Sequence, residues 1–390
     1  MLPSVHTSHL LPLHLCDQAF WDSSGQGYHL VVAHGTQEVF YNPGVNVTPG
    51  MPLISVVIPN YNGAACLETC LRSLLRQGDH RQELLVVDNG SRDHSIELVR
   101  RLAPQARILP QPCNLGFAAA INCGIRAARG EWIAVLNNDT EVAAGWLAAC
   151  LEAIERHPEA SFLACRILDY HDRDRVYSAG DCFLRAGLGY RRGQEQPDGE
   201  EYGREIPIFS ACGCAALYRK AALEAAHGYD EHFFAYLEDV DLGLRLQAAG
   251  AAGYYVPGAR VYHLGGATSG GEFAPLAVRL RTRNAILLLL KSIPGRILLR
   301  CTPMILAGQV SWFGRAAAHG RLLSYLHGLA GIFPLLPAML KKRRALRRLW
   351  KNSAPRLWRS ILESEKMACR DFLPSREARS RFLAWYFHWF

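Results

Sequence analysis

Acidic residues are missing from a long part of this 390-residue chain. Residues 273–362 contain no Asp or Glu but 17 Lys or Arg, whereas residues 1–272 contain 21 Lys or Arg and 31 Asp or Glu. An acidic body is therefore followed by a strongly basic segment. Such asymmetry is typical of proteins that bind a polyanion or an anionic membrane surface.

Several signals of other protein classes are absent as well. The twelve cysteines form no C-x-x-C pair, which favours reduced thiols over a disulfide framework or a structural zinc site. Neither G-x-G-x-x-G nor G-x-x-x-x-G-K-[ST] occurs, which excludes a dinucleotide fingerprint and a P-loop. No Lys or Arg precedes Arg72, and Pro3 and Pro12 interrupt the first apolar stretch, so we expect no secretory signal.

Short apolar stretches alternate with helical patterns after residue 52. The apolar stretches, each predicted as a strand, are 53–58, 83–88, 106–110 and 131–136. The helical patterns are 65–77, 93–102 and 116–128. This alternation predicts an α/β fold with a parallel sheet and helices on both faces. Residues 1–50 are predicted as a separate β-like extension with two short strands around a turn.

Polar residues follow three of the predicted strands. They are Asn60, Asn62, Asp88, Asn89, Asn137 and Asp139. Each alone could simply form a turn, since Asn and Asp are common turn residues. Ligands of parallel sheets bind beyond the carboxyl ends of the strands, so three such sets at one edge favour a binding site. An Asp at this edge also suits a hard divalent cation that bridges to phosphate oxygens.

Seven motifs carry a resemblance to a known family. In order they are VVIPNYNG, LLVVDNGSRDHS, NLGFAAAINCGI, VLNNDT, SACGCAALYRKAAL, GYDEHFFAYLEDVDLGLRLQAAG and YHLGGATS, within residues 53–270. This set resembles the family 2 glycosyltransferases, and among them the rhamnosyltransferase-like branch. The resemblance implies a GT-A fold, which is a Rossmann-like mixed sheet that binds a nucleotide-diphosphate sugar. It also implies inverting transfer to an acceptor hydroxyl, assisted by Mg²⁺ or Mn²⁺.

The resemblance assigns roles to individual residues. The nucleotide-sugar site would be formed by Pro59, Asn60, Asn62, Asp88, Asn114, Gly116, Asn122, Asn137 and Asn138. Asp139 would bind the metal ion, because residues 137–139 occupy the place of the family's D-x-D motif. Asn137 departs from that motif by one negative charge, which puts the metal affinity in question. His263 matches a position that can complete the metal or pyrophosphate site, although a His after a strand can also be structural.

Three carboxylates crowd the segment LEDVD: Glu238, Asp239 and Asp241. The apolar spacing over 237–244 predicts an amphipathic helix, and acids are favoured in its first turn. By the resemblance, Asp239 is the base that takes the proton of the acceptor hydroxyl, and Glu238 orients Asp239 or the acceptor. We interpret Asp241 as a first-turn acid that pairs with Arg245 on the helix surface.

Residues 322–340 carry no charged side chain, which is near the lower limit for a membrane span. Pro334 and Pro337 interrupt this stretch, so a helical hairpin lying in the membrane interface fits it better. A helical subdomain packed on the catalytic domain is the alternative. We predict that 285–348 contacts an anionic membrane surface, that the protein is cytoplasmic at the inner face of the cell membrane, and that it binds no nucleic acid.

These expectations divide the chain into an extension (1–50), a catalytic domain (51–271) and a helical, membrane-associating region (272–390). The donor would be a nucleotide-diphosphate sugar, with dTDP-rhamnose suggested by the branch. The acceptor would be a cell-surface glycan or its lipid-linked precursor. A catalytically degenerate relative that binds nucleotide sugar or scaffolds an assembly is the alternative, and Asn137 is its only support.

Overall fold

The computed structural model describes residues 19–21, 27–31, 36–40, 53–78, 81–265, 270–372 and 380–389. The chain forms two compact units, Met1–Pro49 and Gly50–Phe390. The first unit contains an antiparallel sheet of β1 (Ala19–Trp21), β2 (Gly27–Val31) and β3 (Thr36–Phe40). The two strands predicted within residues 1–50 are therefore confirmed, while the rest of that extension lies outside the described residues.

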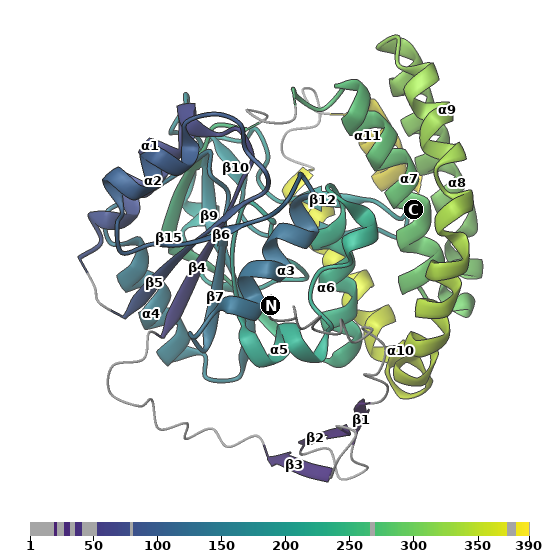
Figure 1. The fold of residues 1–390 in the computed structure, drawn as a ribbon. Helices are drawn as coiled ribbons and strands as arrows, with labels where there is room; N and C mark the ends of the chain where they lie inside the picture. Colours follow the sequence, from purple (N-terminus) through teal and green to yellow (C-terminus); the bar gives the residue numbers. More distant parts are fainter. Residues whose placement is uncertain are drawn as a thin grey trace, which may run out of the picture. The chain divides into compact units, whose positions relative to one another are not determined.

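A ten-stranded mixed sheet forms the centre of the second unit (Figure 1). Its order is β13-β15-β9-β14-β7-β4-β5-β6, with β10 paired to β9 and β8 paired to β15. The strands are β4 (Ile54–Asn60), β5 (Gln82–Asp88), β6 (Arg107–Pro110), β7 (Trp132–Leu136), β8 (Thr140–Val142), β9 (Ala160–Asp169), β10 (Val176–Ser178), β13 (Ile206–Pro207), β14 (Ala215–Arg219) and β15 (Ala252–His263). Strands β4 to β7 are mutually parallel, so their carboxyl ends meet at one edge.

Helices cover both faces of this sheet because successive strand residues point to opposite sides. Val56 of β4 packs on the side of α1, α2 and α4, whereas its neighbour Val57 packs on the side of α3, α5 and α6. The helices are α1 (Ala64–Leu75), α2 (Ser95–Leu102), α3 (Phe117–Ala127), α4 (Trp146–Arg156), α5 (Lys220–Ala225) and α6 (Glu238–Ala249). The predicted α/β class and the predicted strands and helices between residues 53 and 136 are confirmed.

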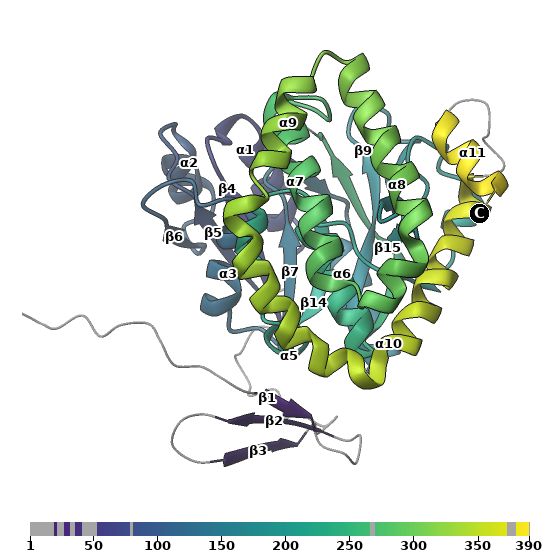
Figure 2. The same cartoon turned by 90° about the vertical axis from the view of Figure 1, so that its right-hand side faces the viewer.

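The C-terminal helices form a further layer on α6 (Figure 2). They are α7 (Pro275–Ser292), α8 (Gly295–Ala318), α9 (Leu322–Ala330), the short η3 (Phe333–Leu335), α10 (Leu336–Phe372) and α11 (Arg381–Trp389). Val240 and Leu244 of α6 pack against this layer, while Leu242 and Leu246 pack into the sheet core. The predicted helix is confirmed, but it is buried on two sides, because its predicted apolar stripe meets the C-terminal layer and its other side packs into the sheet core.

Two prolines separate helices α9 and α10. Pro334 lies in η3 and Pro337 in the first turn of α10, as the sequence suggested.

A hairpin of β11 (Asp181–Phe183) and β12 (Gly189–Arg191) places Asp181 opposite Arg191. Directly opposed residues of an antiparallel pair lie on the same face, so these two side chains start from one side of the hairpin.

Candidate active site

The polar residues predicted at the strand ends meet at the carboxyl edge of the sheet. Asn60 is the last residue of β4 and lies opposite Asp88, the last residue of β5, and Pro59 precedes Asn60 on β4. Asn138 Nδ2 donates to Asn60 Oδ1 at 2.8 Å, which ties the loop after β7 to β4. Asn60 Nδ2 in turn donates to Ser91 Oγ at 3.1 Å. The structure thus brings three sequence-distant loops into one hydrogen-bonded edge.

Side-chain amides shape the loops around this edge. Asn62 has a φ of 50° and accepts a hydrogen bond from the Arg92 N–H at 2.8 Å. Asn89 Nδ2 donates to Asn114 Oδ1 at 3.0 Å and to the Gly116 carbonyl at 3.1 Å. Gly116 has a φ of 92°, and a Cβ at this position would lie 2.6 Å from the carbonyl oxygen of Phe234. These residues hold the loops in place, and their roles toward a nucleotide sugar stay predictions.

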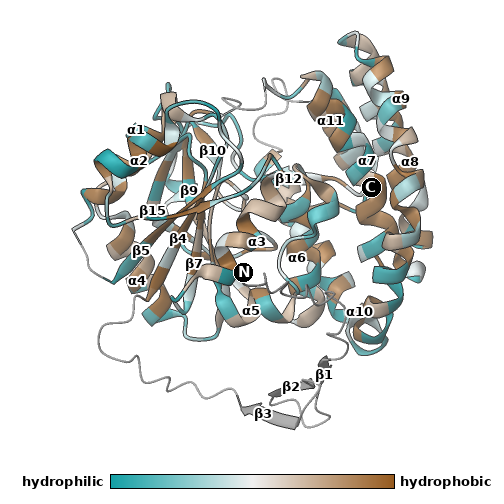
Figure 3. Cartoon of the chain, viewed as in Figure 1, coloured by the Kyte–Doolittle hydropathy of each residue, from teal (hydrophilic) through white to brown (hydrophobic). Residues whose placement is uncertain are grey.

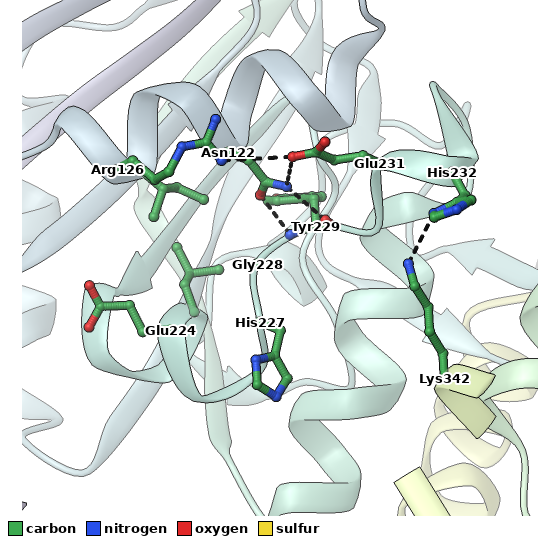
Figure 4. A pocket seen from close by; sticks show the side chains of 11 residues that line it. Asn122, Arg126, Glu224, His227, Gly228, Tyr229, Glu231, His232 and Lys342 are labelled. Atoms are coloured by element: carbon green, nitrogen blue, oxygen red, sulfur yellow. Dashed lines mark hydrogen bonds and ion pairs between the residues drawn. The ribbon is translucent and has the colours of Figure 1, made fainter. Parts of the chain in front are cut away.

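Asn122 serves a different part of the molecule (Figure 4). It lies on α3, where its Oδ1 accepts from the Tyr229 N–H at 2.8 Å and its Nδ2 donates to Glu231 Oε1 at 2.9 Å. It lines a pocket of about 410 Å³ that includes His232 and Lys342 but none of the other predicted site residues. Asn122 therefore fixes the loop that leads toward α6, and its predicted contact with the donor is untested.

Asp139 and His263 form a pair because β8 pairs with β15. Thr140 lies opposite His263 in that pairing, which brings Asp139 Oδ1 within 3.2 Å of His263 Nε2. Both side chains are buried. The two atoms are near enough for an ion pair but lack hydrogen-bonding geometry, and neither finds another hydrogen-bond partner among the described residues. The buried Oδ1 atom of Asn137, two residues before Asp139, also has no hydrogen-bond partner within the part of the chain that the structure describes.

This pair has the geometry that a hard cation requires. Octahedral Mg²⁺ binds ligands at about 2.1 Å, so two adjacent ligands lie about 3 Å apart. The 3.2 Å between Asp139 Oδ1 and His263 Nε2 agrees with that spacing. Unsatisfied buried polar atoms are costly unless they meet a ligand. The residues therefore fit a divalent cation, and the metal-binding role of His263 stays a prediction.

Glu238 and Asp239 occupy the first turn of α6. Leu237 precedes them with a left-handed φ of 65°, which turns the chain sharply into the helix. Asp239 Oδ2 accepts a hydrogen bond from the Gly213 N–H at 2.9 Å. Burial raises the pKa of Asp239, and burial together with the charge of Asp239 raises the pKa of Glu238 well above its ordinary value. A raised pKa makes a carboxylate a stronger base, which suits the predicted role of Asp239.

Asp241 lies in a buried network of charges. Its predicted pair with Arg245 is present, with Arg245 Nη2 at 2.9 Å from Asp241 Oδ2. The prediction that this pair lies on the surface is wrong, because Asp241 is 0% exposed. Lys291 Nζ and Ser292 Oγ, both from α7, donate to the same carboxylate at 2.7 and 2.6 Å. Burial alone would raise the pKa of Asp241, but Lys291 and Arg245 hold it below its usual value. Asp241 thus anchors α6 to the C-terminal layer.

Asp181 is a site residue that the sequence analysis did not identify. Its carboxylate, Cys212 Sγ and the Asp239 carboxylate each have a ligand atom within 4.8 Å of the others. Burial and then the charge of Asp239 raise the pKa of Asp181 to about 7, although Ser178 Oγ donates to it at 2.8 Å. The only sequence signal was an isolated Asp in the apolar stretch AGDCFL. A thiol is a soft ligand that suits Mg²⁺ or Mn²⁺ poorly, so this cluster is a weaker candidate for such an ion.

Residues 212–214 connect the two halves of the site. The Cys214 carbonyl accepts a hydrogen bond from the Asn137 N–H at 2.9 Å, next to the predicted metal ligand. The Gly213 N–H binds Asp239, and a Cβ on Gly213 would lie 3.1 Å from the same carboxylate oxygen. Cys212 lies against Asp181 and Asp239. This short segment therefore contacts both the loop that carries Asp139, the predicted metal ligand, and the half-buried carboxylate of Asp239, the predicted base.

Comparison with known proteins agrees with this geometry. The profile of the family described as Glycosyl transferase family 2 matches residues 55–226. The N-acetylglucosaminyl-diphospho-decaprenol L-rhamnosyltransferase of Mycobacterium tuberculosis is 32% identical over 239 residues, which cover 54% of this chain and 76% of that protein. The O-antigen biosynthesis protein RfbC of Myxococcus xanthus is 29% identical over 214 residues, which cover 52% of this chain and 16% of that protein.

A solved structure shares the fold. The crystal structure of GalNAc-T7 with UDP, GalNAc and Mn²⁺ superposes with a TM-score of 0.50 at 16% identity, covering 63% of this chain and 48% of that one. The chain belongs to glycosyl transferase family 2 and has its GT-A fold. It is accordingly a glycosyltransferase that transfers a sugar from a nucleotide sugar, and the Myxococcus xanthus relative is named for O-antigen biosynthesis.

Proposed function

We propose that this chain is an inverting, metal-dependent transferase that moves a deoxyhexose, such as rhamnose, from a nucleotide-diphosphate sugar to a hydroxyl of a lipid-linked glycan. The observation that carries the proposal is the link through residues 212–214 between Asn137, two residues before Asp139, and the half-buried carboxylate of Asp239. The name of the Mycobacterium tuberculosis relative supports a rhamnosyl donor and a diphospholipid acceptor.

The proposed mechanism is a direct displacement. The acceptor oxygen attacks the anomeric carbon, the bond to the donor diphosphate breaks, and Asp239 takes the hydroxyl proton. The Gly213 N–H holds Asp239 Oδ2 at 2.9 Å, so the carboxylate is fixed before the acceptor arrives. Glu238, the neighbour of Asp239 in the first turn of α6, would orient Asp239 or the acceptor. A divalent cation held by Asp139 and His263 would supply positive charge to the leaving diphosphate.

Membrane association is proposed for the C-terminal helices. The stretch Leu322–Phe372 is long and apolar enough to cross a membrane, and 17% of its most apolar window is buried. Hydrophobic residues also occur along α8 and α9, where the ribbon is coloured brown (Figure 3). Those exposed are Leu299, Leu306, Val310, Phe313, Leu322, Leu323, Leu326 and, on η3, Phe333. Together with the acid-free basic segment 273–362 they fit an anionic membrane interface.

The transfer proposal is tested by nucleotide-diphosphate release. We expect the wild type to release product from one member of a panel of nucleotide sugars, with a membrane extract as acceptor source and Mn²⁺ present. Asp239→Asn should abolish release while retaining donor binding, because the amide keeps the shape but cannot take a proton. Asp172→Asn, an exposed substitution, is the matched control. Binding without release by the wild type across all donors and metals would favour the degenerate alternative, and equal release by both proteins would place the base elsewhere.

Inversion and membrane binding have separate tests. NMR of the product linkage should show an anomeric configuration opposite to that of the donor. Flotation with vesicles that contain anionic lipid should capture the chain, and Leu306→Ser with Val310→Ser should weaken capture. Leu115→Ser, an exposed apolar position in the catalytic part, is the control. Capture unaffected by the α8 substitutions and by salt would contradict the proposed surface.

A further inference from the structure

The β11–β12 hairpin carries a second side chain that the mechanism above leaves unused. Arg191 lies directly opposite Asp181 and on the same face of the hairpin. It does not close an ion pair with Asp181, since no carboxylate of the described residues lies within ion-pair distance of its guanidinium. The Cζ atom of Arg191 lies instead 4.4 Å from the centre of the Tyr177 ring.

Tyr177 connects this arginine to the cation pair. The Tyr177 ring meets the His263 ring edge to face, with centroids 4.6 Å apart. One face of Tyr177 thus supports Arg191 while the ring packs on a predicted metal ligand. The charge of Arg191 also acts on the other end of the site, because it favours the ionised forms of Asp181 and Asp239. Arg191 therefore lies between the proposed cation site and the proposed base.

The guanidinium has free donors at this position. No hydrogen bond from the Arg191 side chain to another described residue is present, in contrast to Arg245 and Arg185, which bind carboxylates and carbonyls. Arg191 is half-buried beside the buried Asp181 and Cys212. A guanidinium offers five N–H groups in a planar fork, and no nitrogen of Arg191 is among the fully buried atoms without a partner, so the fork is accessible to a ligand that supplies acceptors. A diphosphate presents paired anionic oxygens of matching geometry.

We propose that Arg191 is a substrate-binding residue that donates hydrogen bonds to a diphosphate group during transfer. The inference rests on the proposed function, which places a diphosphate on the donor and, for a lipid-linked acceptor, a second one on the acceptor. In the reaction the acceptor oxygen bonds to the anomeric carbon, the donor C–O bond breaks and its electron pair leaves with the diphosphate. The hydroxyl proton goes to Asp239, and Arg191 exchanges no proton.

Calorimetry tests whether Arg191 binds a diphosphate, the group that the donor and the lipid-linked acceptor have in common. The ligands are inorganic pyrophosphate and nucleoside diphosphates, in the presence of Mn²⁺. Arg191→Gln should weaken pyrophosphate binding at least tenfold, whereas Arg191→Lys, which keeps the charge but loses the fork, should weaken it less. Arg300→Gln is the matched control, because Arg300 also stacks on an aromatic ring, at 4.6 Å from the centre of the Trp358 ring, but lies on α8. Unchanged pyrophosphate affinity in folded Arg191→Gln overturns the proposal.

Kinetics distinguish the two sources of the diphosphate. If Arg191 contacts the donor, Arg191→Gln should weaken nucleoside diphosphate binding and raise the KM for the donor. If it contacts the acceptor, the KM for a lipid-diphosphate acceptor should rise, and the effect should vanish with an alkyl glycoside acceptor. Loss of thermal stability with both KM values unchanged would reduce Arg191 to a structural residue and overturn the proposal. If the wild type turns over no nucleotide sugar, the proposed function fails, and pyrophosphate binding still decides the role of Arg191.

Discussion

Asp181→Asn should make the folded protein more stable at neutral pH. Asp181 is buried beside Asp239, and burial and then that neighbouring charge raise its pKa from 3.8 to about 7. Between these two pH values the folded chain binds more protons than the unfolded chain. Stability therefore falls as the pH rises from about 4 to about 7, and the loss is complete above pH 7. The Asn side chain carries no charge and is nearly isosteric, so it should remove this loss.

The expected magnitude follows from the size of the shift. A change in pKa from 3.8 to about 7 corresponds to about 4 kcal/mol of stability at pH 8. For a unit the size of Gly50–Phe390, with an unfolding entropy of about 2 cal/mol/K per residue, this equals a rise of about 6 °C in Tm. The gain should shrink steadily below pH 7 and be near zero close to pH 4.

Thermal unfolding of wild type and Asp181→Asn should be compared at several pH values between 4.5 and 8.5. Asp172→Asn, which changes an exposed carboxylate, should follow the wild type throughout. Two Tm curves that run parallel for wild type and Asp181→Asn, or a variant less stable than wild type at pH 8, would refute the reasoning. Either result would mean that Asp181 is not held in an environment that opposes its charge.

Three further predictions concern other parts of the molecule. Lys291→Met should lower the free energy of unfolding by about 3–5 kcal/mol, because it removes the cation shared by the buried carboxylates of Asp230 and Asp241. Denaturant titration checks this prediction, with Lys351→Met, at an exposed position, as the control. Equal unfolding midpoints for the two variants would contradict it. His263→Ala should weaken Mn²⁺ binding at least tenfold by calorimetry, and unchanged affinity would move the metal elsewhere. Gly116→Ala should lower nucleotide-sugar affinity more than Gly145→Ala, since both glycines have positive φ but only the Cβ at 116 would clash; equal affinities would show that the loop tolerates the contact.

Much of the fold and of the donor side of the site was accessible from sequence. Asn60, Asp88 and Asn138 follow strands whose apolar runs are local signals, and parallel strands necessarily bring their carboxyl ends to one edge. Asp139 and His263 were identified by their motifs, but only the pairing of β8 with β15 explains why they lie 3.2 Å apart.

The sequence could not predict features that depend on distant packing. Asp181 and Arg191 reach the site through a hairpin without a motif, and nothing local to 181 or 191 indicates that Asp239 lies beside them. The Asp241–Arg245 pair was visible from its spacing, but its burial depends on Lys291 and Ser292 from α7. Nothing near Asn122 in the sequence indicates that its amide binds the loop at Tyr229, more than a hundred residues away along the chain.

The sequence by itself determined the α/β alternation, the polar strand ends, the acidic turn at Glu238 and Asp239, and the basic C-terminal segment. Each of these features depends only on residues that are close together along the chain. Only the tertiary structure decided which carboxylates are buried, which cations pair with them and that the Arg191 guanidinium lies against Tyr177. The physical reason is that burial and charge pairing depend on contacts between residues far apart along the chain, and such contacts leave no periodic local pattern.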